Sequence, residues 1–328
     1  MGIFWSVSGG LGALGALSAS WLGLRGASGV QLLGRAGHSR RPKQDVPAQL
    51  KCAGFVTRAA RCDMSCSEEV AFAAGGPGLG AERGLLHAGG LLRDAPVGLQ
   101  TAGGFRAVLG PKVAGLQNFL RSTSNANLQA VKMFSSIAAL LGSPGQLNYS
   151  AANGHLDFMA HQLRGVGAAA VSVQWGPWAD VGMAQQHRGT QHRMERMGLH
   201  MVTPRGGLGA LAAAVYSVSG ASVTSAMAFG GCAAQSPVLA ALDVFWERVK
   251  DSLKKSHSPV YAALQEMLPD MIFAEALGTD ASGRAPPEET VPGGTNSGAH
   301  TTIVVMGEEQ AMSAISTVVR DVLGSDVD

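Results

Sequence analysis

The N-terminal segment places the strongest constraint on the fold of this chain. A short apolar run, Ile3–Val7, leads directly into a turn with the pattern Gly10-x-Gly12-x-x-Gly15. Small and apolar residues follow at helical spacing as far as Gly26. This order predicts a buried strand, a tight turn and a helix that begins at the turn. In that geometry backbone N–H groups and the helix dipole bind a pyrophosphate, and the glycines let the backbone approach its oxygens.

The next predicted strand indicates which dinucleotide the site prefers. Val30–Leu33 is followed closely by Arg35, and no Asp or Glu occurs before Asp45. A site for NAD places a carboxylate here for the ribose 2′-OH, whereas a site for NADP places an arginine against the 2′-phosphate. Arg35, with Arg40 and Arg41 behind it, can form bidentate hydrogen bonds to a phosphate. A solvated basic loop is the alternative, but together with the glycines these cations favour NADP.

The composition excludes several classes of protein. The chain has 328 residues, 46% of them hydrophobic and 15% charged, with a formal net charge of +2. That apolar content fills a core and excludes a wholly disordered chain, and the balanced charge argues against a nucleic-acid-binding protein. No run of about 18 apolar residues is present, so we expect no transmembrane helix and no membrane partner. The four cysteines and the scattered histidines lack the spacing of a metal site, so we predict no metal.

The N-terminus also has a second interpretation, as a targeting segment. Residues 1–44 contain no acidic residue and five cations, which is compatible with a transit peptide. Leu11–Leu24 resembles the apolar region of a signal peptide, but a signal peptide carries its positive charge before that region, and here every cation follows it. We therefore expect a cytoplasmic protein, with organellar targeting as the open alternative.

The densest group of reactive side chains lies near the middle of the chain. A predicted strand, Val131–Phe134, runs into Ser136, and Tyr149 opens a predicted helix. A serine at a strand end and a tyrosine at a helix start can converge on one carbonyl oxygen, where one donates a hydrogen bond and the other a proton as hydride arrives. Tyr149 and Asn153 are four residues apart and share one helical face.

Tyr149 needs a nearby cation if it is to act as an acid. A free tyrosine has a pKa of about 10, and a cation lowers that value by favouring the phenolate. The residue one turn after Tyr149 is Asn153, which is uncharged. The cation must therefore come from elsewhere in the chain. Lys112 opens an earlier helical pattern and is the candidate. A solvated lysine at a helix start is the alternative.

These segments resemble the ketoreductase domain of modular polyketide synthases, which belongs to the short-chain dehydrogenase/reductase superfamily. The longest similarities are FSSIAALLGSPGQLNYSAAN at 134–153 and QWGPWADVGM at 174–183. Shorter motifs extend the resemblance over most of residues 5–265: SGGLGALG at 8–15, LLGR at 32–35, CD at 62–63, HAGGLLRD at 87–94 and GPK at 110–112. In this family Tyr-x-x-x-Asn replaces the usual Tyr-x-x-x-Lys, and the lysine comes from the earlier helix.

The resemblance implies an α/β fold, a Rossmann-type doubly wound parallel sheet of the short-chain dehydrogenase/reductase kind. Residues 1–265 would form the NADP-binding ketoreductase catalytic domain. A Gly-, Pro-, Ser- and Thr-rich stretch predicts a linker over 266–300. Residues 301–328 would form a terminal helix, because apolar residues recur there at helical spacing and resemble the first helix of an acyl carrier domain. That helix ends before the serine that would bear phosphopantetheine.

The resemblance also implies roles for individual residues. Tyr149 would be the general acid, Ser136 would bind the β-keto oxygen, Lys112 would lower the pKa of Tyr149, and Asn153 would hold the lysine or a proton-relay water. Seven residues would bind NADPH: Gly10, Gly12, Gly15, Arg35, Asp63, His87 and Gly89.

The substrate implied is a β-ketoacyl thioester on a phosphopantetheine-linked acyl carrier domain, with other synthase domains as further partners. Trp175 and Trp178 would line the groove that receives it, and residues 182–200 would form the lid. In the family an Asp at the position of Asp94, with no Trp at the position of Leu141, accompanies D, usually 3R, hydroxyl products.

The chain departs from the family pattern in several places, among them Leu11, where the family usually has Thr, and His87-Ala88-Gly89-Gly90, where a Gly replaces an Ala. Arg93 stands where the family usually has Asp, residues 66–84 are rich in glycine where the family has a helix that feeds a strand, and the structural half that normally precedes the catalytic half is not seen. Two other functions therefore stay open. The alternatives to a ketoreductase are a catalytically impaired NADP-binding structural module and a stand-alone short-chain carbonyl reductase.

Overall fold

The computed structural model describes residues 2–38, 55–76, 79, 82–123, 127–179, 194–196, 198–216, 237–244, 272–275 and 302–305. The chain divides into two compact units, unit 1 at Met1–Trp175 and unit 2 at Gly176–Asp328. Three of the sequence predictions lie outside the described residues: Arg40 and Arg41, most of the lid at 182–200, and the apolar stripe of the predicted terminal helix at 315–323.

Unit 1 contains a parallel sheet with the strand order β3-β2-β1-β4-β5-β6. Every neighbouring pair along this path is parallel. Its strands are β1 (Phe4–Ser8), β2 (Gly29–Gly34), β3 (Thr57–Arg61), β4 (Glu82–His87), β5 (Asn127–Ser136) and β6 (Ala170–Trp175). The order reverses between β1 and β4, which makes the carboxyl ends of these two strands the switch point where such sheets bind ligands. The Rossmann-type fold expected from the sequence is confirmed.

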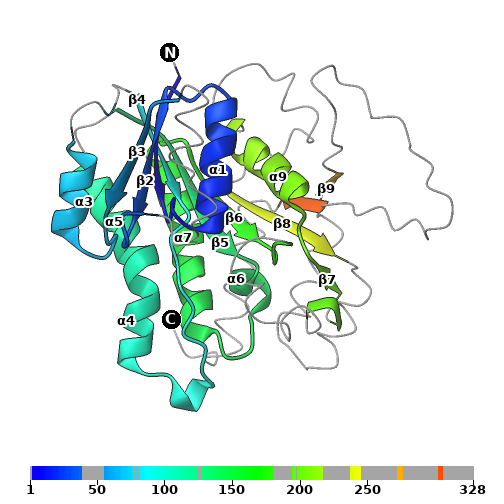
Figure 1. Cartoon of the computed structure of the whole chain (residues 1–328). Coiled ribbons are helices and arrows are strands. Elements are labelled where there is room, and N and C mark those ends of the chain that lie inside the picture. Colours follow the sequence, from blue (N-terminus) through cyan, green and yellow to red (C-terminus); the bar gives the residue numbers. More distant parts are fainter. Residues whose placement is uncertain are drawn as a thin grey trace. The chain divides into compact units, whose positions relative to one another are not determined.

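Within the described residues, helices connect β1 to β2, β3 to β4, β4 to β5 and β5 to β6, as parallel pairing requires. They are α1 (Ala13–Leu24), α3 (Ser67–Ala74), the 3-10 turn η1 (Val97–Leu99), α4 (Ala102–Leu109), the π-helical turn η2 (Gly110–Ala114), α5 (Gly115–Ser122), α6 (Ala138–Leu141) and α7 (Leu147–Gly165). α3 packs beside α5, and α4 packs beside α7 (Figure 1). The glycine-rich stretch 66–84 therefore does form a helix and the start of a strand.

The core of unit 1 lies along the central strands. All residues of β1 and of β6 are buried, and Val7, Leu32 and Leu85 have no accessible surface. Continuous burial of this kind is expected for parallel strands that are covered on both faces. β3 is the outermost strand of the path and carries exposed or half-buried residues, including two arginines that discourage pairing with another chain.

Unit 2 contains β7 (Leu199–His200), α9 (Pro204–Tyr216), β8 (Val238–Val244), β9 (Ile272–Glu275) and β10 (Thr302–Val305). β10 pairs antiparallel with both β8 and β9, and β7 pairs antiparallel with β8. β9 lies inside the predicted linker at 266–300, and β10 lies at the start of the predicted helix at 301–328. Both segments are strands because they contain aromatic or β-branched residues, which favour extended backbone.

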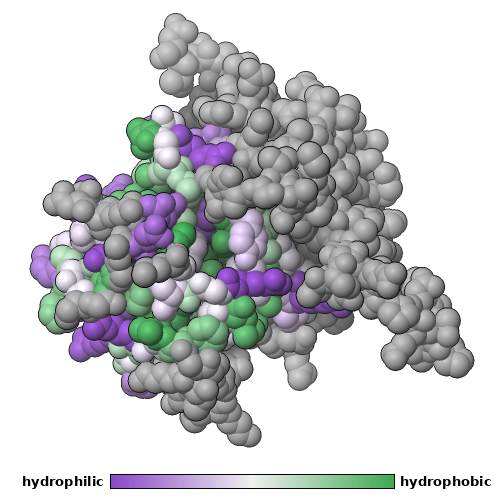
Figure 2. All heavy atoms as spheres, turned by 90° about the horizontal axis from the view of Figure 1, so that it is seen from above, coloured by the Kyte–Doolittle hydropathy of each residue, from purple (hydrophilic) through white to green (hydrophobic). Residues whose placement is uncertain are grey.

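The described surface mixes polar and apolar side chains. Figure 2 shows hydrophilic and hydrophobic residues side by side on one face of the molecule. The large apolar side chains that are exposed include Phe72 on α3 and Val166 just after α7. Of the helices that the structure describes, none is long and apolar enough to cross a membrane.

Candidate active site

The glycine turn between β1 and α1 has the form of a phosphate cradle. Gly9 has a φ of +67°, and a Cβ on Gly10 would lie 2.7 Å from the carbonyl oxygen of Val7. A Cβ on Gly15 would collide with the backbone of Gly9. Gly12 caps α1 without a side-chain hydrogen bond, and the first turn of the helix contains no acidic residue. This turn therefore offers the positive end of a helix and close backbone access, which fits the pyrophosphate of a dinucleotide.

The ends of β2 and β3 bring Arg35 and Asp63 into one region. Cys62 N–H donates to the carbonyl oxygen of Gly34 at 3.1 Å, which joins the two strand ends. The Asp63 carboxylate accepts hydrogen bonds from the N–H and hydroxyl of Ser65 at 2.9 and 2.6 Å. Partial burial raises the pKa of Asp63, but these hydrogen bonds and the charge of Arg35 outweigh it, so the net pKa is lowered. An exposed arginine and a charged carboxylate thus lie where a 2′-phosphate and an adenine are expected.

His87 is placed differently from its predicted role in NADPH binding. Its ring is fully buried, with Nδ1 2.8 Å from the Ser8 hydroxyl and Nε2 2.9 Å from the carbonyl oxygen of Lys112. Burial, followed by the Lys112 charge, lowers the pKa of His87 to about 4, so the ring is neutral. Because a carbonyl only accepts, Nε2–H donates to Lys112 and Nδ1 accepts from Ser8. Both ring nitrogens are therefore used within the protein, and His87 holds the backbone of Lys112.

Ser8 extends this connection to the predicted NADPH-binding glycine of the loop that follows β4. Its hydroxyl oxygen accepts a hydrogen bond from Gly89 N–H at 3.2 Å. A Cβ on Gly9 would lie 2.9 Å from the Cα of Gly89, so the two loops that follow β1 and β4 run in close contact. Their junction is the switch point of the sheet, where the nicotinamide end of a dinucleotide is expected.

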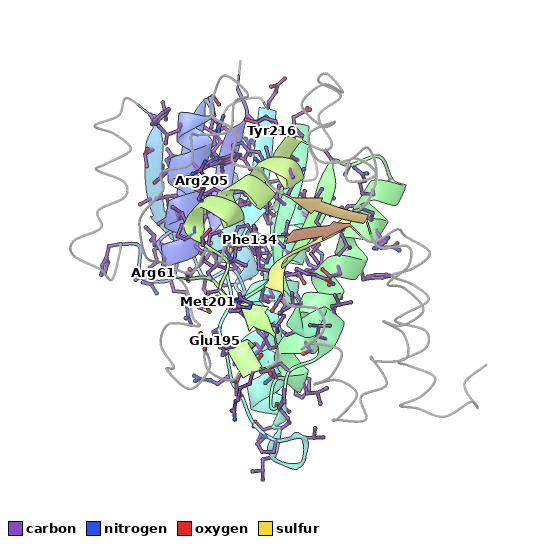
Figure 3. All side chains as sticks on the ribbon, turned by 90° about the vertical axis from the view of Figure 1, so that its right-hand side faces the viewer. Arg61, Phe134, Glu195, Met201, Arg205 and Tyr216 are labelled. Carbon is purple, nitrogen blue, oxygen red and sulfur yellow. The ribbon has the colours of Figure 1, made fainter. Side chains whose placement is uncertain are left out.

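Lys112 reaches Tyr149 from a different helix. It lies in the π-helical turn η2, a local geometry that often marks functional sites. Its Nζ donates to the carbonyl oxygen of Phe134 at 2.7 Å and lies 5.5 Å from the centroid of the Tyr149 ring, within cation–π range. Lys112 is 3% exposed, and this burial lowers its pKa to about 7. Phe134, whose carbonyl accepts the hydrogen bond from Lys112, lies on β5 and is labelled in Figure 3.

Tyr149 and Ser136 meet where β5 ends and α7 begins. Tyr149 is 9% exposed, and Ser136 is half-buried and also accepts from Ala138 N–H at 3.2 Å. Burial raises the pKa of Tyr149, and hydrogen bonds with the Asn153 and Ser136 side chains only partly oppose this, so the net pKa is raised. Desolvation of the phenol is the largest cause of this net change, and the effect of Lys112 on the pKa of Tyr149 stays a prediction.

Asn153 lies one turn beyond Tyr149 and is fully buried. Its Nδ2 donates to the backbone carbonyl of Tyr149 at 2.8 Å, and its own carbonyl accepts from the Ser135 hydroxyl at 3.3 Å. Among the described residues its Oδ1 has no hydrogen-bond partner. That buried acceptor is the group that the predicted contact with a lysine or a relay water requires.

The residues predicted to control substrate orientation fall into two groups. Asp94 is exposed, accepts from Gln146 Nε2 at 3.0 Å and lies near enough to Tyr149 to raise its pKa. Leu141 is buried at the end of α6. The two tryptophans are core residues within their own units: the Trp175 ring lies 5.0 Å from that of Phe134, and Trp178 packs against Gly207 of α9. Burial of both rings gives no support to a role in lining a groove.

Several residues of the site were missed from the sequence. Asn148 donates to the carbonyl of Arg93 at 2.8 Å and to Gln100 Oε1 at 3.0 Å. Gln100 in turn donates to the carbonyl of Ala95 at 2.7 Å. These amides fasten the loop that carries Asp94 to the start of α7. Isolated amides in loops carry no periodic signal, so nothing in the sequence alone indicates this connection.

Asp157 was also missed, although its position offered a signal. It lies eight residues after Tyr149 on the same face of α7 and is 6% exposed. Its carboxylate accepts from the Ser172 hydroxyl at 2.6 Å and from Gln174 Nε2 at 2.9 Å. Burial raises the pKa of Asp157 to about 6, against the effect of these hydrogen bonds and of the Lys112 charge.

A comparison with protein families decides the classification. Residues 4–180, more than half of the chain, match the family described as KR domain. The chain belongs to the KR domain family. The resemblance to ketoreductase domains of modular polyketide synthases, inferred above from sequence motifs, is thereby confirmed.

Curated relatives of this KR domain chain are very long proteins. It is 31% identical over 321 residues to polyketide synthase GfsB of Streptomyces halstedii, an alignment that covers 97% of this chain and 5% of the relative. It is 34% identical over 266 residues to polyketide synthase GfsA of the same organism, which covers 80% of this chain and 3% of the relative. The chain thus spans a small part of the relatives it matches.

Several solved structures with a similar fold are ketoreductases. An A-type ketoreductase from a modular polyketide synthase has a TM-score of 0.66 and 29% identity, with 76% of this chain and 49% of that chain covered. The first ketoreductase of the tylosin polyketide synthase has a TM-score of 0.65 and 28% identity, with 77% and 51% covered. This KR domain chain spans about half of each.

Proposed function

We propose that this chain reduces a carrier-bound β-ketoacyl thioester to the β-hydroxyacyl thioester, with NADPH as the reductant, as part of polyketide or related fatty-acid-like biosynthesis. One observation carries the proposal. The buried Nζ of Lys112 lies 5.5 Å from the centroid of the Tyr149 ring, and the Ser136 and Asn153 side chains act on the pKa of the Tyr149 phenol. A cation, a phenol and a hydroxyl gathered at the end of β5 form the group that carbonyl reduction needs.

The residues present fit NADPH. The uncapped turn at Gly10, Gly12 and Gly15 would hold its pyrophosphate, Arg35 its 2′-phosphate, and Asp63 its adenine end. When bound, NADPH supplies a hydride to the carbonyl carbon of the substrate. Side chains of this chain would bind the carbonyl oxygen of the substrate and supply the proton.

Ser136 and Tyr149 would hold the carbonyl oxygen of the substrate by hydrogen bonds. The raised pKa of Tyr149 keeps its proton in place until negative charge develops on that oxygen, when the phenol gives the proton up. The Lys112 ammonium then stabilises the phenolate through the ring that it faces. The buried Oδ1 of Asn153 can hold the ammonium or a water that returns the proton.

Asp94 and Leu141 bear on the stereochemistry of the proposed product. Asp94 is fastened to Gln146 and acts on Tyr149, so it can contribute to the orientation of the substrate. With no tryptophan at position 141, we propose the D, usually 3R, series for the product. The partner would be a phosphopantetheine-linked acyl carrier domain, together with other domains of a synthase.

Turnover of a model thioester tests the function. The full chain is mixed with NADPH and the N-acetylcysteamine thioester of a β-keto acid, and oxidation of NADPH is followed by its absorbance. Stereospecific formation of the β-hydroxy thioester supports the proposal. Binding of NADPH without turnover indicates an impaired structural module instead. Reduction of simple ketones in preference to the thioester indicates a stand-alone carbonyl reductase.

A further inference from the structure

The helix α7 carries three polar residues on one buried face. Tyr149, Asn153 and Asp157 follow one another at intervals of four residues, so their side chains lie on the same side of the helix. All three are buried, and α7 packs against β5 and β6. Among the residues whose burial is described, Asp157 is the only buried carboxylate.

Hydrogen bonds offset part of the cost of burying the Asp157 charge. Both carboxylate oxygens accept hydrogen bonds from neutral donors on β6, the Ser172 hydroxyl and the Gln174 amide, at 2.6 and 2.9 Å. The Ser135 hydroxyl, which donates to the Asn153 carbonyl, also acts to lower the pKa of Asp157. Donors of this kind stabilise a carboxylate but supply no positive charge, so a buried Asp157 still needs a counter-charge.

Lys112 presents the opposite situation. Its Nζ donates to the carbonyl of Phe134, which is neutral, and a buried ammonium without an anion is costly. The titratable groups around it are His87 from β4, which is neutral, and Tyr149 and Asp157 from α7. Lys112 Nζ bonds the carbonyl of Phe134 on β5, and Asp157 accepts from Gln174, which is the β6 partner of Ser135, the next residue of β5. Within the described residues, Asp157 is thus the anion whose charge acts on Lys112, and the effect is mutual.

We propose that Asp157 is a positioning residue, whose buried carboxylate keeps the Lys112 ammonium charged beside the Tyr149 ring. It does so from within the polar layer between α7 and the sheet, without touching substrate or cofactor. The catalytic consequence rests on the function proposed above, whereas the electrostatic pairing of Asp157 with Lys112 does not.

The direction of the effect follows from the burial of Lys112. Burial lowers the pKa of Lys112 to about 7, and the Asp157 charge works against that decrease. Replacing Asp157 by Asn keeps the size of the side chain and removes the charge. The pKa of Lys112 should then fall further, by on the order of one pH unit.

Lys132 provides a matched internal control. It is a fully buried lysine on β5, and burial also lowers its pKa to about 7. Its Nζ donates to the backbone carbonyl of Ala169 at 3.4 Å, and the charge that acts on it is that of Arg164 rather than of Asp157. Loss of the Asp157 charge should therefore leave the titration of Lys132 where it is.

The test is a pH titration of the full chain labelled with 13C at the lysine ε-carbons and observed by NMR. Signals of Lys112 and Lys132 are assigned from the Lys112→Arg and Lys132→Arg variants. In Asp157→Asn the Lys112 signal should titrate about one pH unit lower than in the wild type, with that of Lys132 unmoved. An unmoved Lys112 signal, or an equal shift of both lysines, overturns the proposal.

The same experiment separates this proposal from the proposed function. If Lys112 shifts but the wild-type chain does not reduce the thioester, the pairing stands and the function fails. If the wild type reduces the thioester and Lys112 does not shift, the pairing fails alone. Should Asp157→Asn not fold, the wild-type titration still decides: the Lys112 signal must show a second inflection where the Asp157 carboxyl carbon titrates, and a single inflection overturns the proposal.

Discussion

The ammonium group of Lys112 lies 5.5 Å from the centroid of the Tyr149 ring, although η2 and α7 are separate elements of the chain. Lys112 thus brings a cation beside Tyr149 from another element, whereas the position one turn after Tyr149 is occupied by the uncharged Asn153. The backbone of Lys112 is held by His87 and its Nζ by the carbonyl of Phe134. Two neighbouring strands of unit 1, β4 and β5, thus hold this cation in place.

Tyr149→Phe removes the proton donor while keeping the ring that faces Lys112. We expect the turnover rate to fall by about a hundredfold or more, because general acid catalysis is lost. NADPH affinity should change little, since the hydroxyl lies at the substrate end of the site. Steady-state turnover and NADPH binding by fluorescence check the two parts. A large loss of NADPH affinity would contradict the assignment of Tyr149 as the acid.

Gly10→Ala places a methyl group 2.7 Å from the carbonyl oxygen of Val7 and distorts the turn before α1. NADPH affinity should fall by about tenfold or more. Gly98→Ala is the matched control, because a Cβ there has no atom within 4 Å. Equal NADPH affinity in both variants would show that the turn does not hold the pyrophosphate.

Arg35→Asp reverses the charge expected at the 2′-phosphate. The preference for NADPH over NADH should decrease by about tenfold to a hundredfold, the range set by loss of a hydrogen bond to a charged group. Arg106→Asp changes an arginine on α4 in the same way and should leave the preference unaltered. The ratio of kcat/KM for the two cofactors is the measurement. If the ratio is the same in both variants, Arg35 is a surface residue.

His87 makes the stability of unit 1 depend on pH. Its pKa in the folded chain is lowered to about 4 from 6.5, so between these values the unfolded chain binds a proton that the folded chain does not. The free energy of unfolding should therefore fall as the pH is lowered from about 6.5 to about 4. Denaturant unfolding at several pH values measures this slope. His87→Gln should flatten it, whereas the exposed His38→Asn should not; equal slopes would contradict the prediction.

Much of the fold and site could be predicted because the signals are local. The glycine turn, the strand that ends at Ser136 and the helix that opens at Tyr149 are each contained in a short segment. The role of His87 could not be predicted in the same way. It depends on where the carbonyl of Lys112 lies, which only the packing of η2 against β4 determines.

The role of Asp157 and the strands β9 and β10 also depend on contacts between segments that are far apart in the sequence. Asp157 shares a helical face with Tyr149, but its partners, Ser172 and Gln174, lie on β6, and sequence spacing does not show which strand packs against the helix. The strands β9 and β10 pair with each other across a long stretch rich in glycine and proline. Composition of that stretch predicts a linker, and the long-range pairing that creates the strands leaves no local pattern.

The central claim is that Lys112 supports proton transfer from Tyr149, and the rate of a single turnover tests it most directly. NADPH-loaded chain is mixed rapidly with the β-keto thioester, and the wild type is compared with Lys112→Met. We predict that hydride transfer slows by about a hundredfold or more in the variant, with NADPH affinity nearly unchanged. Hydride transfer at the wild-type rate in a folded Lys112→Met chain would contradict the account.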